Sequence, residues 1–190
     1  MSSPEPEAQS AAERLLEREA PAGYLAAWAR SLVDAPVAAR TADVSAAVFR
    51  LGEERFALDA SVVREVHVPR AVHRVPGRTN EIFRGLVALR GELHLCVDLH
   101  ALLGCARPPA DSTRVPARMM VVGRPGEAWA FEADEVKDVR RYDPARVAPA
   151  QVTVAKAAVR FTDGIVDLGD GPIAILDAGR LFAGLARSLS

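Results

Sequence analysis

Four side chains of metal-binding type alternate along one short stretch of the sequence: His94, Cys96, Asp98 and His100. If residues 93–100 formed one β-strand, alternate side chains would lie on the same face of a sheet, so all four could converge on one ion. The pattern therefore raises the hypothesis of a small metal-dependent enzyme that uses this cluster.

Other catalytic motifs are missing from the sequence. It contains neither a GxxxxGK[ST] nor a GxGxxG phosphate-binding loop, and it has no GxSxG, HExxH or CxxC motif. His67 and His73 lie near predicted turns without an obvious carboxylate partner, so we expect both side chains to be solvated. Because no nucleophile, base and orienting group occur together, the sequence predicts neither catalysis nor a bound cofactor.

The composition excludes several classes of partner. The chain has 190 residues, of which 49% are hydrophobic, with 24 basic against 25 acidic side chains. Nucleic-acid binding is not expected, because nonspecific affinity for phosphates comes largely from clustered Lys and Arg. The sequence has no apolar run of about 18 residues and no secretory leader, so we expect a cytoplasmic protein without membrane insertion. Cys96 and Cys105 are too few for a disulfide framework and are expected to be reduced.

Residues 1–42 have the spacing of two short helices. The first begins with a capping-box pattern from Ser10 to Glu13 and stops before Pro21. The second places Leu25, Trp28 and Leu32 on one stripe and ends near Pro36. We therefore predict an N-terminal helical extension over residues 1–42, whose apolar stripe packs either on the rest of the chain or on a partner.

The pattern changes at about Asp43 and is typical of a mainly β domain over residues 43–190. Turn residues separate the short β-rich runs, which suggests small barrels or a sandwich. Helical stretches follow at Asp98–Leu103 and Asp177–Leu185, each with its Asp as N-cap. The β-rich runs are AVFRL, RFALD, GLVAL, LHLCV, MMVV, AWAFE, AAVRF, GIVDL and PIAIL.

The β region repeats itself. Residues 56–66 correspond to residues 129–139, 73 positions later, and both copies contain a V-basic-acidic-V motif. Residues 85–102 correspond to residues 164–181, 79 positions later. This predicts two similar lobes with a groove between them, at about 43–105 and 116–190, with exchange of segments between the lobes left open.

The repeat distinguishes structural residues from candidate contacts. Ile173 and Ile175 replace His94 and Cys96 in the second copy, which favours a packing face over a metal site. Asp98 and Asp177 correspond to each other as helix caps, and Glu65 corresponds to Asp138, so part of the role of Glu65 is expected to be structural.

Arg90 has no counterpart in the second copy, where Gly169 stands instead. It occupies an apparent hairpin turn, LRGEL, where arginine is not a favoured residue. An arginine that the fold does not require could bind a partner carboxylate or carbonyl through two hydrogen bonds. The alternative interpretation is an ordinary solvated turn residue.

Together these segments resemble the CheW family of bacterial chemotaxis adaptors along nearly all of residues 44–190. A Gly, an LRG turn five residues later, a VDL soon after, and a DEV block in the second half make the joint pattern fairly specific. The matching segments are VVREV, EIFRGLVALRGELHLCVDLHALLG, AWAFEADEVKDV and FTDGIVDLGDGPIAILDAGRLF.

The resemblance implies a fold of two five-stranded SH3-like β-barrels with short helices. It implies a non-catalytic adaptor that couples the cytoplasmic tips of methyl-accepting chemoreceptors to a CheA-type histidine kinase, recruited to membrane-associated receptor arrays. The residues that match partner-binding positions of the family are Val63, Glu65, Gly85 and Arg90.

The sequence departs from the family pattern in places. Leu95 stands where a Pro is common, and Ala88 where a polar residue is usual. The N-terminal segment AERLLEREAPAGYLAAWARSL is absent from minimal adaptors and looks like the leader of Wsp-type surface-sensing adaptors. Besides the adaptor and the metal-dependent enzyme, a standalone interaction module whose N-terminal helices bind another partner remains an alternative.

Overall fold

The computed structural model describes residues 43–78, 80–109, 115–149 and 156–189, all within one compact unit, Thr41–Ser190. The helical extension predicted at 1–42 lies outside the described residues. In chain order the elements are β1 (Val44–Leu51), β2 (Glu54–Asp59), the 3-10 turn η1 (Ala60–Val62), β3 (Val63–His67), β4 (Phe83–Leu89), β5 (Glu92–Val97), α3 (Leu99–Leu103), β6 (Arg118–Arg124), β7 (Glu127–Ala133), β8 (Glu135–Tyr142), η2 (Pro144–Arg146), α4 (Lys156–Val159), β9 (Thr162–Asp167), β10 (Pro172–Leu176) and α5 (Ala178–Arg187).

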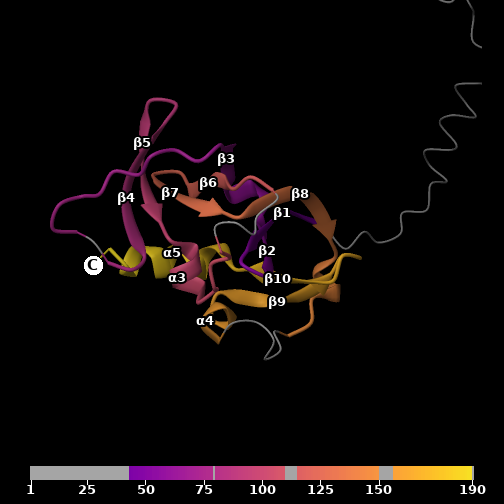
Figure 1. Ribbon diagram of the computed structural model, residues 1–190. Coiled ribbons are helices and arrows are strands. Elements are labelled where there is room, and N and C mark those ends of the chain that lie inside the picture. The colour runs from indigo at the N-terminus through magenta and orange to yellow at the C-terminus, as the bar shows by residue number, and fades with distance from the viewer. Residues whose placement is uncertain (1–42, 79, 110–114, 150–155, 190) are drawn as a thin grey trace, which may run out of the picture. The chain divides into compact units, whose positions relative to one another are not determined.

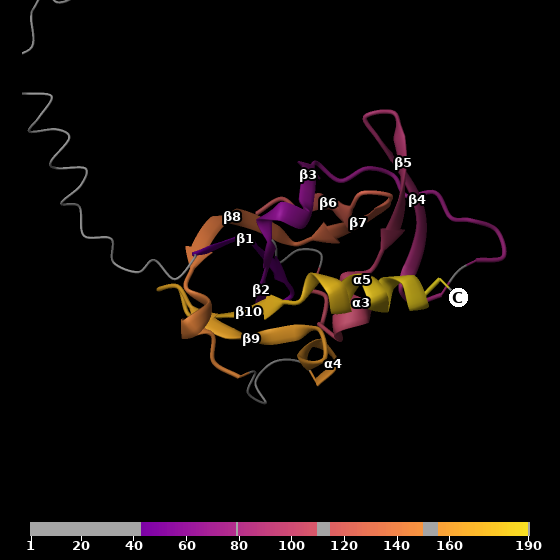
Figure 2. The same cartoon turned by 180° about the vertical axis from the view of Figure 1, so that it is seen from behind.

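The described strands form two five-stranded mixed sheets (Figures 1 and 2). Sheet A has the order β8-β1-β2-β10-β9, and sheet B has the order β3-β6-β7-β5-β4. In the repeat, β1–β5 are equivalent to β6–β10, in that order. When each strand of sheet A is replaced by its equivalent, the strand order of sheet A becomes that of sheet B. Each half of the repeat therefore keeps its first two strands in one sheet and contributes its last three to the other.

This strand order differs from the sequential lobes expected at 43–105 and 116–190. Sheet A takes β1 and β2 from the first range and β8, β9 and β10 from the second, so segments are exchanged between the two halves. The physical reason is that the two copies offer equivalent pairing partners, and local sequence does not say which copy a strand joins.

The parallel strand pairs confirm the predicted repeat at the level of single residues. Phe56 of β2 lies opposite Ala174 of β10, and the equivalent Trp129 of β7 lies opposite Leu95 of β5. The offsets between these pairs are the 73 and 79 positions found in the sequence. The two sheets are therefore built on the same register.

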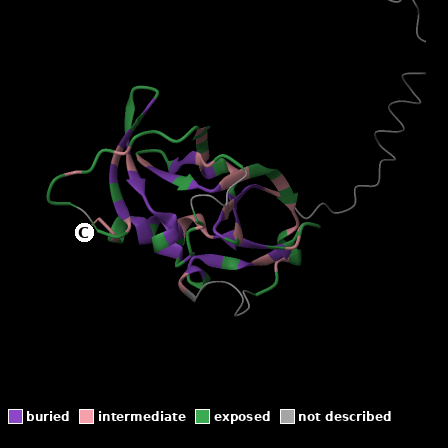
Figure 3. Ribbon diagram, viewed as in Figure 1, coloured by how far each residue is buried: buried purple, intermediate pink, exposed green. Residues whose placement is uncertain are grey.

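One continuous hydrophobic core joins the two sheets and the helices α3 and α5. Its centre contains the rings of Phe49, Phe56 and Phe131, with centroids 6.0 Å apart for the first two and 5.5 Å for Phe49 and Phe131. Figure 3 shows the inner lengths of the strands and the facing sides of the helices as buried. Apolar packing thus occupies much of the region where the sequence suggested a groove between lobes.

Each sheet also has a small core of its own. Cys96 is buried in the small core of sheet B, and the equivalent Ile175 is buried in that of sheet A. The prediction of a packing face is confirmed at Cys96, whereas His94 lies outside this small core and lines a surface cavity. The small core of sheet A contains Ala46, Val48, Ala57, Val166, Ile173 and Ile175, and that of sheet B contains Val87, Leu89, Cys96, Met119, Val121 and Ala130.

Both predicted N-caps are confirmed: Asp98 accepts a hydrogen bond from the Ala101 N–H, and Asp177 accepts one from the Arg180 N–H. The predicted strand AAVRF is wrong, since its first residues belong to the short helix α4, in agreement with the helix propensity of alanine. Strands β3 and β8 are absent from the predicted runs, because charged residues interrupt their apolar pattern, as is common in edge strands.

Candidate interaction surface

The four residues of the proposed metal cluster do not share one strand face. Strand β5 ends at Val97, and Asp98 caps the helix that contains His100, so the alternation of faces stops there. Among the described residues, no group of three or more His, Cys, Asp or Glu side chains is placed to hold a metal ion. Burial also raises the pKa of Cys96 to about 11 and that of Cys105 to about 12, so both thiols are protonated at neutral pH. The fold therefore gives these four residues no shared metal-binding geometry.

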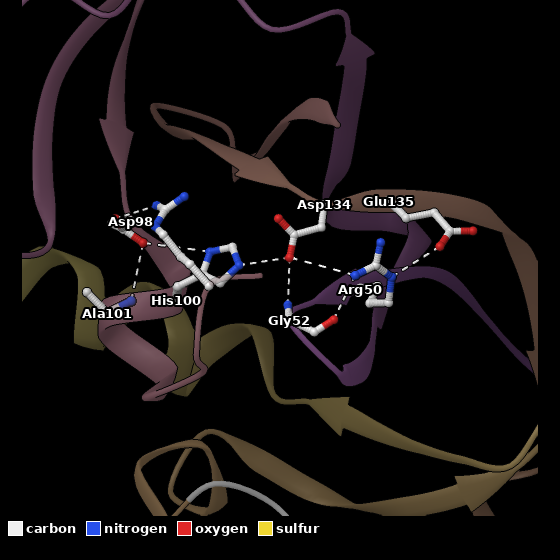
Figure 4. A network of polar contacts seen from close by, with 8 residues as sticks. Arg50, Gly52, Asp98, His100, Ala101, Asp134 and Glu135 are labelled. Atoms are coloured by element: carbon white, nitrogen blue, oxygen red, sulfur yellow. Dashed lines mark hydrogen bonds and ion pairs between the residues drawn. The ribbon is translucent and has the colours of Figure 1, made fainter. Parts of the chain in front are cut away.

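His100 instead belongs to a buried network that connects the two sheets (Figure 4). Its Nε2 lies 2.9 Å from Asp134 Oδ2, and the same oxygen accepts the Gly52 N–H at 2.6 Å. Arg50 donates to the Gly52 carbonyl at 2.7 Å and to Glu135 at 3.2 Å. Because Gly52 follows β1 of sheet A and His100 follows β5 of sheet B, the network fixes the sheets relative to each other. No sequence motif marks Asp134 as the centre of this network.

Two of the four predicted contact residues are brought together. Glu65 lies on β3, Arg90 lies in the β4–β5 turn, and the Arg90 Nε is 3.6 Å from Glu65 Oε2. Strands β3 and β4 are the two edge strands of sheet B. The segment that follows β3 nevertheless reaches β4, where His73 pairs with Leu86. This return closes the sheet around its small core.

Gly85 and Val63 have structural environments of their own. Gly85 has a φ of 134°, and a Cβ there would overlap the carbonyl oxygen of His73, which pairs with Leu86. Gly164 is the repeat equivalent, and a Cβ there would overlap the carbonyl oxygen of Ala148 in the same way. Gly85 is thus needed for closure of the sheet. Val63 is half-buried and packs against the large core.

Arg90 has an unusual backbone conformation. Its φ is 49°, in the left-handed region, and it is the sole non-glycine residue with positive φ in the described part of the chain. Its side chain is 76% exposed, at the hairpin tip that projects in Figure 1. The repeat equivalent, Gly169, has a φ of 99° and occupies the same kind of position at no steric cost.

Glu65 has a second partner that the sequence analysis missed. Its Oε2 lies 2.5 Å from the Nε2 of His67, so the expectation of a His67 side chain without a carboxylate partner is wrong. Residues two apart on a strand share a face, and this spacing was the available signal. The His67 hydrogen bond is the main cause that holds the pKa of Glu65 below its usual value; the charges of Arg90 and His94 act in the same direction.

A cavity of about 370 Å³ lies on sheet B, over β3, β5 and β7. Trp129, Leu93 and Leu95 contribute its largest apolar side chains; Leu93 is 70% exposed, and none of the three was predicted as a contact. Arg64 lines this cavity and the next residue, Glu65, belongs to the charged cluster, so the two candidate surfaces meet at β3, where the pairing with β6 has a bulge between Val63 and Glu65. The lining consists of Arg64, Glu92, Leu93, His94, Leu95, Gly126, Glu127, Ala128 and Trp129.

Comparison with known families decides what these sheets are. A family model described as CheW-like domain matches residues 45–186. The chain belongs to the CheW-like domain family. The crystal structure of the scaffolding protein TtCheW from Thermoanaerobacter tengcongensis is similar to it, with a TM-score of 0.60 and 27% sequence identity, over 72% of this chain and 85% of that chain. No curated protein sequence matches the chain.

As a CheW-like protein, the chain is a non-catalytic scaffold of chemotaxis signalling. A scaffold acts through its surfaces, and the two candidates on this CheW-like domain are the Glu65–Arg90 cluster and the Leu93–Trp129 cavity. Leu95 lies opposite Leu86 and Trp129 in the sheet and lines that cavity. No helix in the described ranges is long and apolar enough to cross a membrane.

Proposed function

We propose that the chain couples the cytoplasmic tips of chemoreceptors to a CheA-type histidine kinase in a cytoplasmic array, and that Val63, Glu65, Gly85 and Arg90 form part of a partner-binding surface. The fold proposed for it is the pair of SH3-like barrels that the family resemblance implies. The observation that supports the surface most is the conformation of Arg90. The second half of the fold has a glycine, Gly169, at the equivalent position. An arginine kept there in a strained backbone conformation is explained best by a function of its side chain.

The chemistry of the surface fits an acidic partner segment. An exposed guanidinium can bind a carboxylate through two parallel hydrogen bonds, and the present neighbour of Arg90 is the Glu65 carboxylate, 3.6 Å away. The cavity lined by Arg64 of β3 offers apolar side chains to a second partner, such as an amphipathic helix. Two surfaces of different chemistry would let one scaffold bind two kinds of partner.

The direct test is a binding measurement with both partners. Purified cytoplasmic fragments of a chemoreceptor and a CheA-type kinase, encoded next to this chain, are bound to the wild type and to Arg90→Ala. We expect at least one dissociation constant to rise about 30-fold, the effect of losing an interface hot spot of about 2 kcal/mol. The matched control is Arg141→Ala, which removes an exposed arginine from β8 of the other sheet. Unchanged binding of both partners by Arg90→Ala would refute this role for the surface.

We also propose that residues 1–42 are the accessory leader of a Wsp-type surface-sensing adaptor. Deletion of this segment separates an adaptor with an accessory leader from a standalone module that binds through its N-terminal helices. The adaptor predicts that residues 43–190 still bind the kinase with unchanged affinity. A shortened chain that folds but binds neither receptor nor kinase would contradict it.

A further inference from the structure

His67 and Arg90 both approach one oxygen atom of Glu65. The Nε2 of His67 lies 2.5 Å from Glu65 Oε2, and the Nε of Arg90 lies 3.6 Å from the same atom. The side chains differ in exposure: 18% for His67, 36% for Glu65 and 76% for Arg90. The imidazole therefore holds the carboxylate from the protein side, while the guanidinium approaches it from solvent.

The repeat contains a second version of this cluster with a permanent cation. The equivalent of Glu65 is Asp138, and the equivalent of His67 is Arg140, which lies on the edge strand β8. Arg140 is 3.1 Å from Asp138 and 2.7 Å from Asp170 in the β9–β10 turn, so its cluster is closed by ion pairs on both sides. The first half has a titratable side chain where the second half has an arginine, which stays protonated at all relevant pH values.

We propose that His67 is a positioning residue of the partner-binding surface: its protonation neutralises Glu65, frees Arg90, and so strengthens binding of an acidic partner segment. This inference rests on the proposed function, because it concerns the same arginine. A protonated imidazole satisfies Glu65 with both a hydrogen bond and a full charge. A neutral imidazole can still donate its N–H, but the uncompensated carboxylate then attracts the guanidinium and competes with the partner.

The charged and titratable groups around the Glu65 carboxylate are His67, Arg90 and His94. The hydrogen bond from His67 and the charge of Arg90 keep the pKa of Glu65 below its usual value, so this carboxylate is ionised at neutral pH. His94 of β5 is the other titratable group near Glu65, and it lies 3.9 Å from Glu92. On β6, the strand paired with β3, Met119 lies opposite His67 and adds no charge.

The test compares two substitutions that fix the charge at position 67. His67→Arg copies the permanent cation of Arg140, and His67→Gln keeps a hydrogen-bond donor without a charge. Dissociation constants for the partner that Arg90→Ala weakens are measured at pH 6 and pH 8. We expect binding by the wild type to be about three- to five-fold weaker at pH 8, the scale of one exposed ion pair. The change in dissociation constant between pH 6 and pH 8 that His67→Arg still shows reports titration of the partner. After correction for that change, His67→Gln should show no remaining pH dependence and should bind weakly at both pH values.

If His67→Gln keeps the wild-type ratio of dissociation constants between pH 8 and pH 6, the inference is overturned. His94 would then be the source of the pH dependence. If Arg90→Ala leaves binding unchanged at both pH values, the proposed function itself fails. If Arg90→Ala weakens binding while both His67 variants keep the wild-type ratio, this inference alone fails. Should a variant not fold, a pH titration of the wild type followed by NMR decides. The Arg90 Nε–H signal must then change at the same pH midpoint as the signals of the His67 ring. A signal that does not follow that ring refutes the inference.

Discussion

The left-handed conformation of Arg90 predicts that stability and binding change in opposite directions. Arginine in this region of backbone space costs about 1–2 kcal/mol, whereas asparagine tolerates it much better. Arg90→Asn also loses the pair with Glu65, but an ion pair whose arginine is 76% exposed contributes only about 0.5 kcal/mol or less. The free energy of unfolding should therefore rise by about 0.5–1 kcal/mol, while partner affinity falls.

Urea unfolding measures the first effect, and the binding assay with receptor and kinase fragments measures the second. Gly91→Ala is the matched control, because Gly91 has a φ of 86° and a Cβ there meets nothing within 4 Å. It should destabilise the fold by about 1 kcal/mol through backbone strain alone. An Arg90→Asn variant that is less stable than the wild type, or more stable with unchanged binding, would refute the link between strain and function.

Three other substitutions or treatments test the rest of the structure. Gly85→Ala should cost clearly more than Gly91→Ala, by about 2 kcal/mol or more in urea unfolding, because only at Gly85 would the new methyl group overlap backbone; equal losses would argue against the close approach. Asp134→Ala should lower the free energy of unfolding by about 2–3 kcal/mol, since it leaves two buried donors without an acceptor, and a loss below about 0.5 kcal/mol would contradict the network. Cys96 and Cys105 should resist a thiol reagent at pH 8 in the native protein and react on unfolding, because burial keeps both protonated; fast reaction of the native protein would show an open core.

The sequence was sufficient to predict most local structure. The repeat, the mainly β character of residues 43–190, and the caps Asp98 and Asp177 all follow from residue type and spacing. The pairing of strands did not follow, because two nearly equivalent copies leave the choice between self-pairing and exchange to long-range packing.

The candidate site was predicted only in part, for a similar reason. Arg90 stands out in the sequence because the repeat lacks it, and the structure adds its strained backbone and its neighbour Glu65. Asp134 was missed because its partners come from distant segments, and Leu93 looks in sequence like any other apolar strand residue. The exposure of Leu93 depends on which face of the sheet the core covers.

The exchange of strands between the two halves has a consequence for folding. Since neither half of the chain contains all the strands of a sheet, neither can bury a complete core before the other arrives. Folding should therefore be dominated by contacts between distant residues and be slow for a chain of this size, with one cooperative unfolding transition rather than two. The same geometry would allow two copies of a single half to complete each other's sheets as a symmetric, strand-swapped dimer.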